Sequence, residues 1–393
     1  MWRAAASNTL TLLVVALALL AGAVAWGQRE WRRPGPLSEA ICVAVEPGST
    51  MRRVSQTLAE RGAVTSDAVF RIGTEYTDLS EELKAGSFIV PEGASMREIA
   101  RIVTEGGAST CGTEIVQRVG VGRTTTVVRG VEAASGRFVT AVEFDPAAEP
   151  EPAIYAEAIE APDTRFRVAV VEGATAAQVV RALEAAPFLE GELGAVPAEG
   201  TLAPDSYEVE PGAPRAEVIA EMRRRQEAIL AEAWAARDPA VPLATPEEAL
   251  ILASIVEKET AQAEERARVA GVFVNRLREG MRLQTDPTVI YGITRGEAPL
   301  GRGLRRSELD AETPWNTYRI DGLPPTPIAN PGRDAIEAAL RPEETEALYF
   351  VADGTGGHAF AATLEEHNRN VARWREIEAA REAEAAEEPS PGQ

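Results

Sequence analysis

The residues from Leu252 to Tyr291 decide the fold and the chemistry of this chain: LASIVEKET (252–260), ERARVAGVFVNRL (265–277) and MRLQTDPTVIYG (281–292). They place carboxylates, an Asn-Arg pair and a Gln-Thr-Asp-Pro turn inside apolar sequence, where a charged group costs free energy unless it is paired or used. Just upstream, Thr245-Pro246-Glu247-Glu248 predicts the start of the helix that carries the acids, with Thr as N-cap, Pro at the first helical position and Glu closing a capping box.

The helical repeat separates the two acids of the EKE triplet. At about 100° per residue, Leu252, Ile255 and Val256 form one apolar stripe, and Glu259 lies near its centre. Glu257 lies roughly 160° away, so we expect it to be solvated or to support the site. Burial would raise the pKa of Glu259 and keep it protonated near neutral pH, as a general acid requires. The alternative is a structural ion pair between Glu259 and an arginine such as Arg276.

Several polar segments, taken in order, resemble the endolytic murein transglycosylase family (YceG-like, also called MltG). They are ASIVEKET, FVNRL, MRLQTDPTVIYG, WNTYRIDGLPPTPIANPG, LYFVADGTGGHAF and HNRNV, all between Thr245 and Val371, with a looser likeness at GTLAPDSYEV (200–209). The resemblance implies a bacterial enzyme, anchored in the inner membrane, that cleaves peptidoglycan glycan strands internally and leaves 1,6-anhydro-N-acetylmuramic acid ends. It also implies an essential glutamate in the EKE motif, which we align with Glu259. We expect no cofactor.

This reaction fits a single carboxylate. A glycoside hydrolase usually uses two acids, whereas here the C6 hydroxyl of the same sugar attacks C1, and Glu259 first protonates the glycosidic oxygen and then accepts the hydroxyl proton. Other side chains are candidates for binding the sugar: Asn275, Gln284, Thr285, Asp286, Tyr291, Asn316 and Tyr318. Asp286 has two alternative roles, capping the next segment or serving as the base of a hydrolase, and aromatic residues such as Trp315 are more often core residues.

The two histidines, His358 and His367, lie in the last segments of the resemblance. Their spacing of nine residues matches no zinc signature, and Asp353 is the only obvious further donor in the turn, so we expect no metal. The sequence predicts a hairpin with strands at 347–352 and 358–361, joined by DGTGG. We expect both histidines to have a structural or supporting role at the floor of the cleft.

The segment from Thr9 to Trp26 is almost wholly apolar and about long enough to cross a membrane. The resemblance favours an uncleaved single-pass anchor in the bacterial inner membrane, with the catalytic domain in the periplasm. A cleaved signal peptide is the alternative, since Ala23-Val24-Ala25 fits an A-x-A cleavage site. The flanking arginines do not decide between them, because they are more numerous after the segment than before it.

Composition limits the partners. The formal net charge of −21 and the isoelectric point of about 4.7 argue against nucleic acid and against anionic lipid as partners. The resemblance implies glycan strands as substrate, with penicillin-binding proteins and other elongation or division proteins as protein partners. Cys42 and Cys111, the only cysteines, are expected to pair in an oxidising periplasm, and two buried free thiols are the alternative.

We therefore expect an α+β protein with six parts. They are an anchor (1–28), a linker (29–37), a LysM-like α/β module (38–110), a β-rich insert with an acidic loop (111–163), an α+β transglycosylase domain (164–378) and a disordered acidic tail (379–393). The module has a strand–helix–helix–strand–helix pattern and either binds N-acetylglucosamine-containing glycans or acts as a spacer. The insert departs from the family pattern. The rival functional hypothesis is a non-catalytic glycan-binding scaffold, which has no use for an acid on an apolar helix face.

Overall fold

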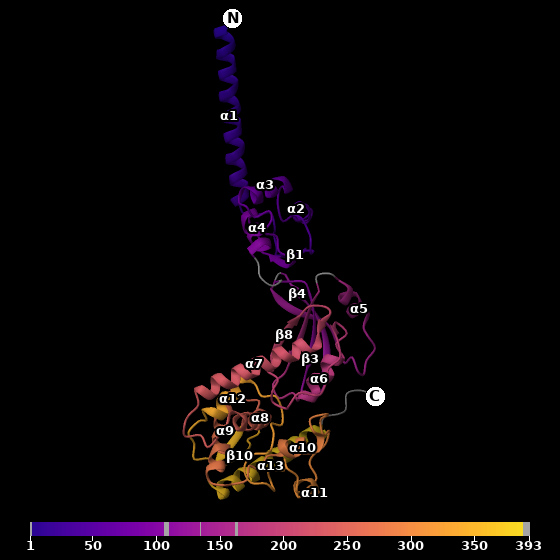
Figure 1. Ribbon diagram of the computed structural model, residues 1–393, viewed down its shortest axis with the longest axis vertical. Helices are drawn as coiled ribbons and strands as arrows, with labels where there is room; N and C mark the ends of the chain where they lie inside the picture. The colour runs from indigo at the N-terminus through magenta and orange to yellow at the C-terminus, as the bar shows by residue number, and fades with distance from the viewer. Residues whose placement is uncertain (1, 106–109, 134, 162–163, 388–393) are drawn as a thin grey trace. The chain divides into compact units, whose positions relative to one another are not determined.

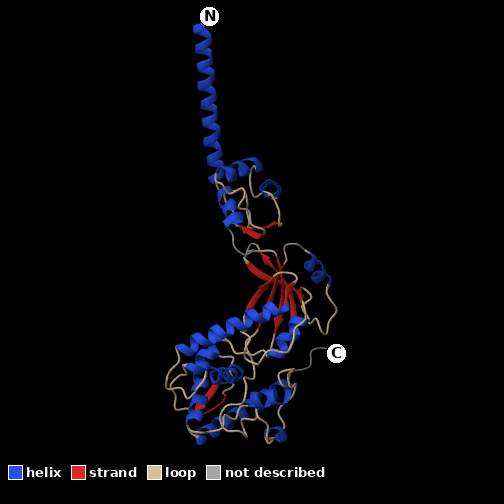
Figure 2. Ribbon diagram, viewed as in Figure 1, coloured by secondary structure: helices blue, strands red, loops and turns tan. Residues whose placement is uncertain are grey.

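The computed structural model describes residues 2–105, 110–133, 135–161 and 164–387 (Figure 1). The chain forms two compact units. The first comprises residues 1–116, 127–144 and 150–165, and the second comprises residues 117–126, 145–149 and 166–393. Helices and strands are mixed along the chain, so the fold is α+β as expected (Figure 2).

The first unit begins with one long helix, α1 (Trp2–Arg32). Its segment Thr11–Arg32 is long and apolar enough to span a membrane, a property that an N-terminal signal sequence shares. Residues 29–32 of the expected linker are instead the last residues of this helix. The reason is Trp31, which is buried with its ring 5.9 Å from the ring of Phe70, so that the end of α1 belongs to a packed core.

The module after α1 has the predicted order of elements: β1 (Ile41–Val45), α2 (Met51–Glu60), α3 (Asp67–Tyr76), β2 (Gly86–Val90) and α4 (Met96–Glu105). The two strands pair antiparallel. Thr50 and Ser66 cap α2 and α3, because their hydroxyls accept N–H groups that have no partner inside the helix. A disulfide joins Cys42 to Cys111, with the two Cα atoms 5.9 Å apart, so the cysteines form the pair that the sequence favours over free thiols.

The Val- and Thr-rich sequence after the module forms strands, as predicted. They are β3 (Thr113–Val119), β4 (Thr124–Glu132) and β5 (Arg137–Phe144). Together with β6 (Arg165–Val170) and β8 (Ser206–Val209) they make one five-stranded sheet in the order β5-β4-β3-β6-β8, so they are not a separate insert. The expected acidic loop contains a helix, α5 (Ala153–Glu160), because Tyr155 is buried edge-on against Phe144 and anchors it.

The rest of the second unit is mainly helical. Its elements are α6 (Ala176–Glu184), the parallel pair β7 (Leu189–Glu190) and β9 (Ala213–Pro214), α7 (Arg215–Ala235), α8 (Pro246–Glu259), α9 (Ala263–Arg278), α10 (Asp286–Thr294), α11 (Arg306–Leu309), α12 (Arg333–Leu340), the hairpin β10 (Tyr349–Ala352) and β11 (His358–Ala361), and α13 (Leu364–Glu387). Helix α8 packs against α7, α9, α10 and α12, and its residues 249–256 are all buried. Its end is thereby fixed inside the unit.

Local sequence signals predict where α8 begins and where the C-terminal tail becomes disordered, and the structure can be compared with both predictions. Helix α8 begins as predicted, with Pro246 at its start and the Thr245 hydroxyl accepting the N–H of Glu248. The carboxylate of Glu248 accepts the N–H of Ala244 rather than that of Thr245, so the capping box is shifted by one residue. The expected disordered tail is helical as far as Glu387, because alanine, glutamate and arginine are strong helix formers. Residues 388–393 of that tail lie outside the described residues.

Candidate active site

Glu259 is the last residue of α8; the residue as a whole is half-buried, and its carboxyl group lies on the buried side. Helix α8 is buried on all sides up to Val256, so the single apolar stripe expected from the sequence does not describe it. Position at the helix end, rather than one face, is what brings the acid beside the QTDP turn. The hydroxyl of Thr285, itself buried, donates a hydrogen bond to Oε1 of Glu259.

The surroundings of Glu259 favour its protonated form. Burial raises the pKa of the carboxyl group most strongly, the hydrogen bond from Thr285 lowers it, the negative charge of Asp286 raises it again and His358 lowers it. The net result is a raised pKa. A neutral carboxylic acid can donate its proton, which an ionised one cannot.

The alternative of a structural ion pair with Arg276 is not what the structure contains. The guanidinium of Arg276 donates to three backbone carbonyls, those of Leu348, Arg282 and Leu283. Among the described residues, no arginine or lysine forms an ion pair with Glu259. Within the described residues, the carboxyl group therefore has a hydroxyl partner and no arginine or lysine partner.

The QTDP turn is held by a residue that the sequence analysis did not select. Gln284 has a left-handed backbone (φ +53°), and its N–H donates to the carbonyl of Thr317 at 3.2 Å. The N–H of Thr285 donates to the hydroxyl of Thr317 at 3.0 Å, and that hydroxyl lies 2.8 Å from the hydroxyl of Thr288. Thr317 is fully buried. Its place in the WNTY motif is the sequence signal for this role, since two motifs 32 residues apart meet through it.

Asp286 and Tyr318 form a second polar pair of the site. The Tyr318 hydroxyl donates to Oδ1 of Asp286 at 2.7 Å. Burial and the Asp286 carboxylate raise the pKa of Tyr318, so the phenol keeps its proton. The side chains of Gln284 and Asp286 are exposed, which leaves them open to a ligand. Asn316, in contrast, is fully buried.

The side chain of Asn316 is occupied within its own loop. Its amide donates to three carbonyls, those of Glu308, Leu309 and Ala311, and its Oδ1 accepts the N–H of Tyr318 at 3.0 Å. Asn275, on α9, likewise donates to the carbonyls of Thr345 (2.7 Å) and Ala347 (3.2 Å). Both asparagines therefore fix loops beside the site, and the structure places neither amide at an exposed surface.

The structure separates the two histidines. The ring Nδ1 of His358 lies 2.7 Å from Oε2 of Glu265, whose other oxygen accepts the backbone N–H of His358 at 2.8 Å. A Cβ on Gly357 would lie 2.6 Å from Oε1 of Glu265, so a larger residue at this position would displace the Glu265 carboxylate from its two contacts with His358. The ring of His367 stacks on Tyr349 instead, with centroids 5.1 Å apart. Of the two histidines, His358 is the one whose charge lowers the pKa of Glu259.

Glu257 and Glu259 have different partners although they are two residues apart. Oε2 of Glu257 accepts the N–H of Gly332 at 2.9 Å. Burial raises the pKa of Glu257, with Glu172, Arg266 and Asp334 as its charged neighbours. A Cβ on Gly332 would lie 1.8 Å from Oε1 of Glu172, so this region is tightly packed. Glu257 thus supports the segment before α12 and not the surroundings of Glu259.

A further acid, Glu199, escaped the sequence analysis. Its Oε1 accepts the N–H of Ala176 at 2.8 Å, and its carboxyl group is hydrogen-bonded to the side chain of Tyr291. Burial raises the pKa of Glu199 to about 7, against the lowering effect of these bonds and of Lys258. Tyr291 therefore joins a half-buried network that also packs on Trp315, at 6.0 Å between ring centroids. The signal for Glu199 was its position directly before the GTLAPDSYEV segment.

Comparison with known proteins agrees with the motifs. The YceG-like family model matches residues 114–373, a range that includes most of the segment at 111–163. An endolytic murein transglycosylase of Bacillus subtilis (strain 168) is 44% identical over 120 residues, covering 30% of this chain and 32% of that protein. An endolytic murein transglycosylase of Streptococcus pneumoniae (strain D39) is 27% identical over 342 residues, covering 84% of this chain and 58% of that protein.

The chain thus spans between a third and three fifths of the length of these relatives. A crystal structure of a YceG-like protein from Listeria monocytogenes is 26% identical and covers 84% of this chain and 99% of that one, with a TM-score of 0.41. The family model alone covers more than half of the sequence and includes the EKE, QTDP and WNTY motifs together with both histidines. The chain therefore belongs to the YceG-like family.

Proposed function

We propose that this protein is an endolytic lytic transglycosylase of peptidoglycan, in which Glu259 is the general acid and then the base. The observation that carries the proposal is a carboxyl group on the buried side of a half-buried residue, with a raised pKa, a hydroxyl partner and no arginine or lysine partner among the described residues, beside exposed polar side chains. The names of the related proteins from B. subtilis and S. pneumoniae support this substrate and this reaction.

The proposed reaction needs no water and no second acid. Glu259 donates its proton to the oxygen that links N-acetylmuramic acid to the next N-acetylglucosamine, and the bond from C1 to that oxygen breaks. The C6 hydroxyl of the muramic acid attacks C1, and its proton returns to Glu259, so a 1,6-anhydro ring replaces the glycosidic bond. Intramolecular attack has a proximity advantage of several kcal/mol, roughly 7 to 11 in favourable geometries. General acid catalysis adds about 10²- to 10⁴-fold in rate.

Asp286 has a defined part in this scheme. Its negative charge raises the pKa of Glu259, and the same charge stabilises the positive charge that develops on the sugar ring as the bond breaks. Tyr318 orients the carboxylate through its 2.7 Å hydrogen bond. Exposed Gln284 is the candidate to bind a sugar hydroxyl or the N-acetyl group.

We place the catalytic part on the outer face of the bacterial inner membrane, held by α1 as an uncleaved anchor. Helix α1 is continuous through Ala23-Val24-Ala25, the candidate cleavage site. The disulfide is compatible with an oxidising compartment. In this location the enzyme would trim or terminate nascent glycan strands beside penicillin-binding proteins and other elongation or division proteins. The LysM-like module would bind glycan or act as a spacer.

The experiment is a digest of purified glycan strands with the full-length protein in detergent, read by mass spectrometry. Wild type should release internal fragments that end in 1,6-anhydro sugar, and Glu259→Gln should reduce the rate by about 10² to 10⁴. Glu257→Gln is the matched control, because it changes the neighbouring acid, and it should still produce anhydro ends.

Other products would identify other functions. Fragments with reducing ends, one water heavier, would show a hydrolase, for which the exposed carboxylate of Asp286 near Glu259 is the candidate base. A folded protein that binds strands without cleaving them would be the non-catalytic scaffold. Loss of activity in Glu257→Gln with activity retained in Glu259→Gln would overturn the assignment of the acid.

A further inference from the structure

The C-terminal end of α1 and one face of α3 line an open apolar hollow. Its volume is about 620 Å³, and its lining includes Val24, Trp26 and Trp31 from α1 with Ile72 and Tyr76 from α3. Three of these side chains are strongly exposed: Trp26 by 59%, Ile72 by 65% and Tyr76 by 82%. Large apolar and aromatic side chains that gather at one exposed place usually mark a binding surface.

Helix α3 cannot move away from α1 without losing core packing. Trp31 is buried against Phe70, and a Cβ on Gly73 would lie only 2.3 Å from the ring of Trp31. Phe70 and Thr74 are the buried residues of α3, so Ile72 and Tyr76 lie on its opposite face. Figure 1 shows α3 crossing the foot of α1, on the side of the module from which α1 leaves.

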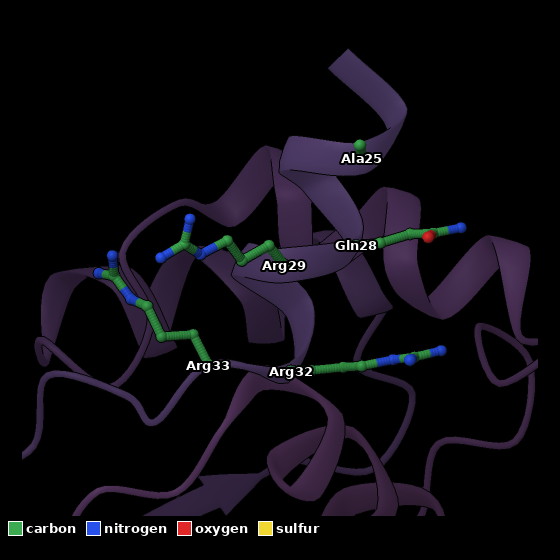
Figure 3. Close-up of a pocket in the computed structure, with 5 residues that line it drawn as sticks. All are labelled: Ala25, Gln28, Arg29, Arg32 and Arg33. Carbon is green, nitrogen blue, oxygen red and sulfur yellow. The ribbon is translucent and has the colours of Figure 1, made fainter. Parts of the chain in front are cut away.

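Basic residues lie around the C-terminal end of α1 itself. Figure 3 shows Arg29 and Arg33 extending on one side of α1, and Gln28 and Arg32 on the other. Arg33 forms an ion pair with Glu30 at 3.4 Å. Arg32 also lines the apolar hollow, so charged and apolar groups share one surface.

The rise per residue of α1 gives the position of this surface relative to the hydrocarbon core of a bilayer. Each residue advances about 1.5 Å, so the apolar run from Thr9 to Trp26 covers about 27 Å, within about 3 Å of the roughly 30 Å hydrocarbon thickness of a bilayer. The headgroup layer adds roughly 5 to 8 Å on each side. Trp26 then lies at the hydrocarbon boundary and Arg29, Arg32 and Arg33 lie among the headgroups. Because the hollow is lined by α1 residues 23–32, Ile72 and Tyr76 lie at the same level.

We propose that Trp26, Ile72, Tyr76 and the three arginines form a docking surface for a bilayer that contains anionic phospholipid. Tyrosine and tryptophan prefer the membrane interface, and arginines there bind phosphate groups. This local positive charge opposes the net charge of −21, so it selects which face of an otherwise acidic protein approaches the membrane. The inference rests on the proposed anchoring of α1. It adds that the module lies against the membrane surface and does not extend freely from it.

The test uses the full-length protein in lipid nanodiscs, with hydroxyl-radical footprinting of Tyr76. Discs of phosphatidylcholine with 30% phosphatidylglycerol should protect Tyr76 several-fold more than discs of phosphatidylcholine alone. Phe138, which is 45% exposed on β5, is the internal control and should be labelled equally in both. The double variant Arg29→Gln/Arg32→Gln should lose the additional protection, since each arginine is worth roughly fivefold in binding to an anionic surface.

Flotation with liposomes tests the anchor separately, so failure of the anchor and failure of the surface can be distinguished. If the protein does not float, the anchoring is wrong, and the inference falls with it. If it floats but Tyr76 is labelled equally in both kinds of disc, the docking surface is refuted while the anchor stands. If N-acetylglucosamine oligomers protect Tyr76 and anionic lipid does not, the surface binds sugar and the proposal is overturned.

Discussion

The buried acid Glu199 should make the stability of the catalytic part depend on pH. Burial raises its pKa from an ordinary value of 4.5 to about 7, so the folded state holds the proton more tightly than the unfolded state. Such a group contributes stability that is fully present below pH 4.5 and is lost as the pH rises through about 7. The shift of 2.5 units, at about 1.4 kcal/mol per unit, corresponds to roughly 3 kcal/mol over the full range.

The substitution Glu199→Gln removes this titration and keeps an oxygen to accept the N–H of Ala176. By proton linkage, about 2 kcal/mol of this contribution to the free energy of unfolding is lost between pH 5.5 and pH 8. Urea denaturation of wild type and variant at these two pH values measures it by circular dichroism. The loss of free energy of unfolding on going to pH 8 should be smaller in the variant by about 2 kcal/mol. Glu257 and Glu259 also have raised pKa values, but their contribution is common to both proteins.

Glu192→Gln is the matched control, because Glu192 is an exposed glutamate seven residues earlier in the same segment. It should leave the pH dependence of wild type unchanged. Equal pH dependence in wild type and Glu199→Gln would refute the argument, because Glu199 would then be ionised in the fold at no cost. A larger loss in the variant would show that the sign of the shift is wrong.

Three further substitutions test other contacts. Thr285→Val removes the hydroxyl that lowers the pKa of Glu259, so the alkaline limb of the pH–rate profile should move to higher pH, and a limb that stays or moves down contradicts the proposed hydrogen bond. Cys42→Ser opens a loop closed over 69 residues at Cys111 and should destabilise the first module by about 4 kcal/mol in urea, whereas unchanged unfolding would show that the pair is not formed. Gly357→Ala should displace the Glu265 carboxylate from His358 and lower activity at unchanged secondary structure, while wild-type kinetics would show that the contact between Glu265 and His358 is not needed.

Elements with local signals were predicted well. The start of α8 follows from a threonine before a proline, and the β10–β11 hairpin follows from a glycine-rich turn between apolar runs. Each of these depends on a few neighbouring residues and on backbone geometry that they decide by themselves. The same reasoning placed Thr285 and Asp286 in a turn, and α10 indeed starts at Asp286.

Contacts between distant segments were not predictable in this way. Thr317 supports the QTDP turn across 32 residues, and Asn275 turns toward carbonyls 70 residues away. Both side chains form hydrogen bonds with backbone groups that tertiary packing buries. The periodicity of the local sequence does not predict this packing. The burial of α8 on every face is another such case, because it depends on the helices that surround it.

The disulfide between Cys42 and Cys111 also decides how the chain bears tension. A protein that is fixed in a membrane and grips a polymer is pulled along its backbone. Cys42 lies in β1 and Cys111 lies two residues before β3, so the pulling force passes through the sulfur–sulfur bond and the residues between them carry none of it. Unfolding of those 69 residues would otherwise lengthen the tether by about 240 Å, at roughly 3.5 Å per residue. If the chain is anchored as proposed, the cross-link keeps the distance between β1 and β3 constant even when the residues between the two cysteines unfold.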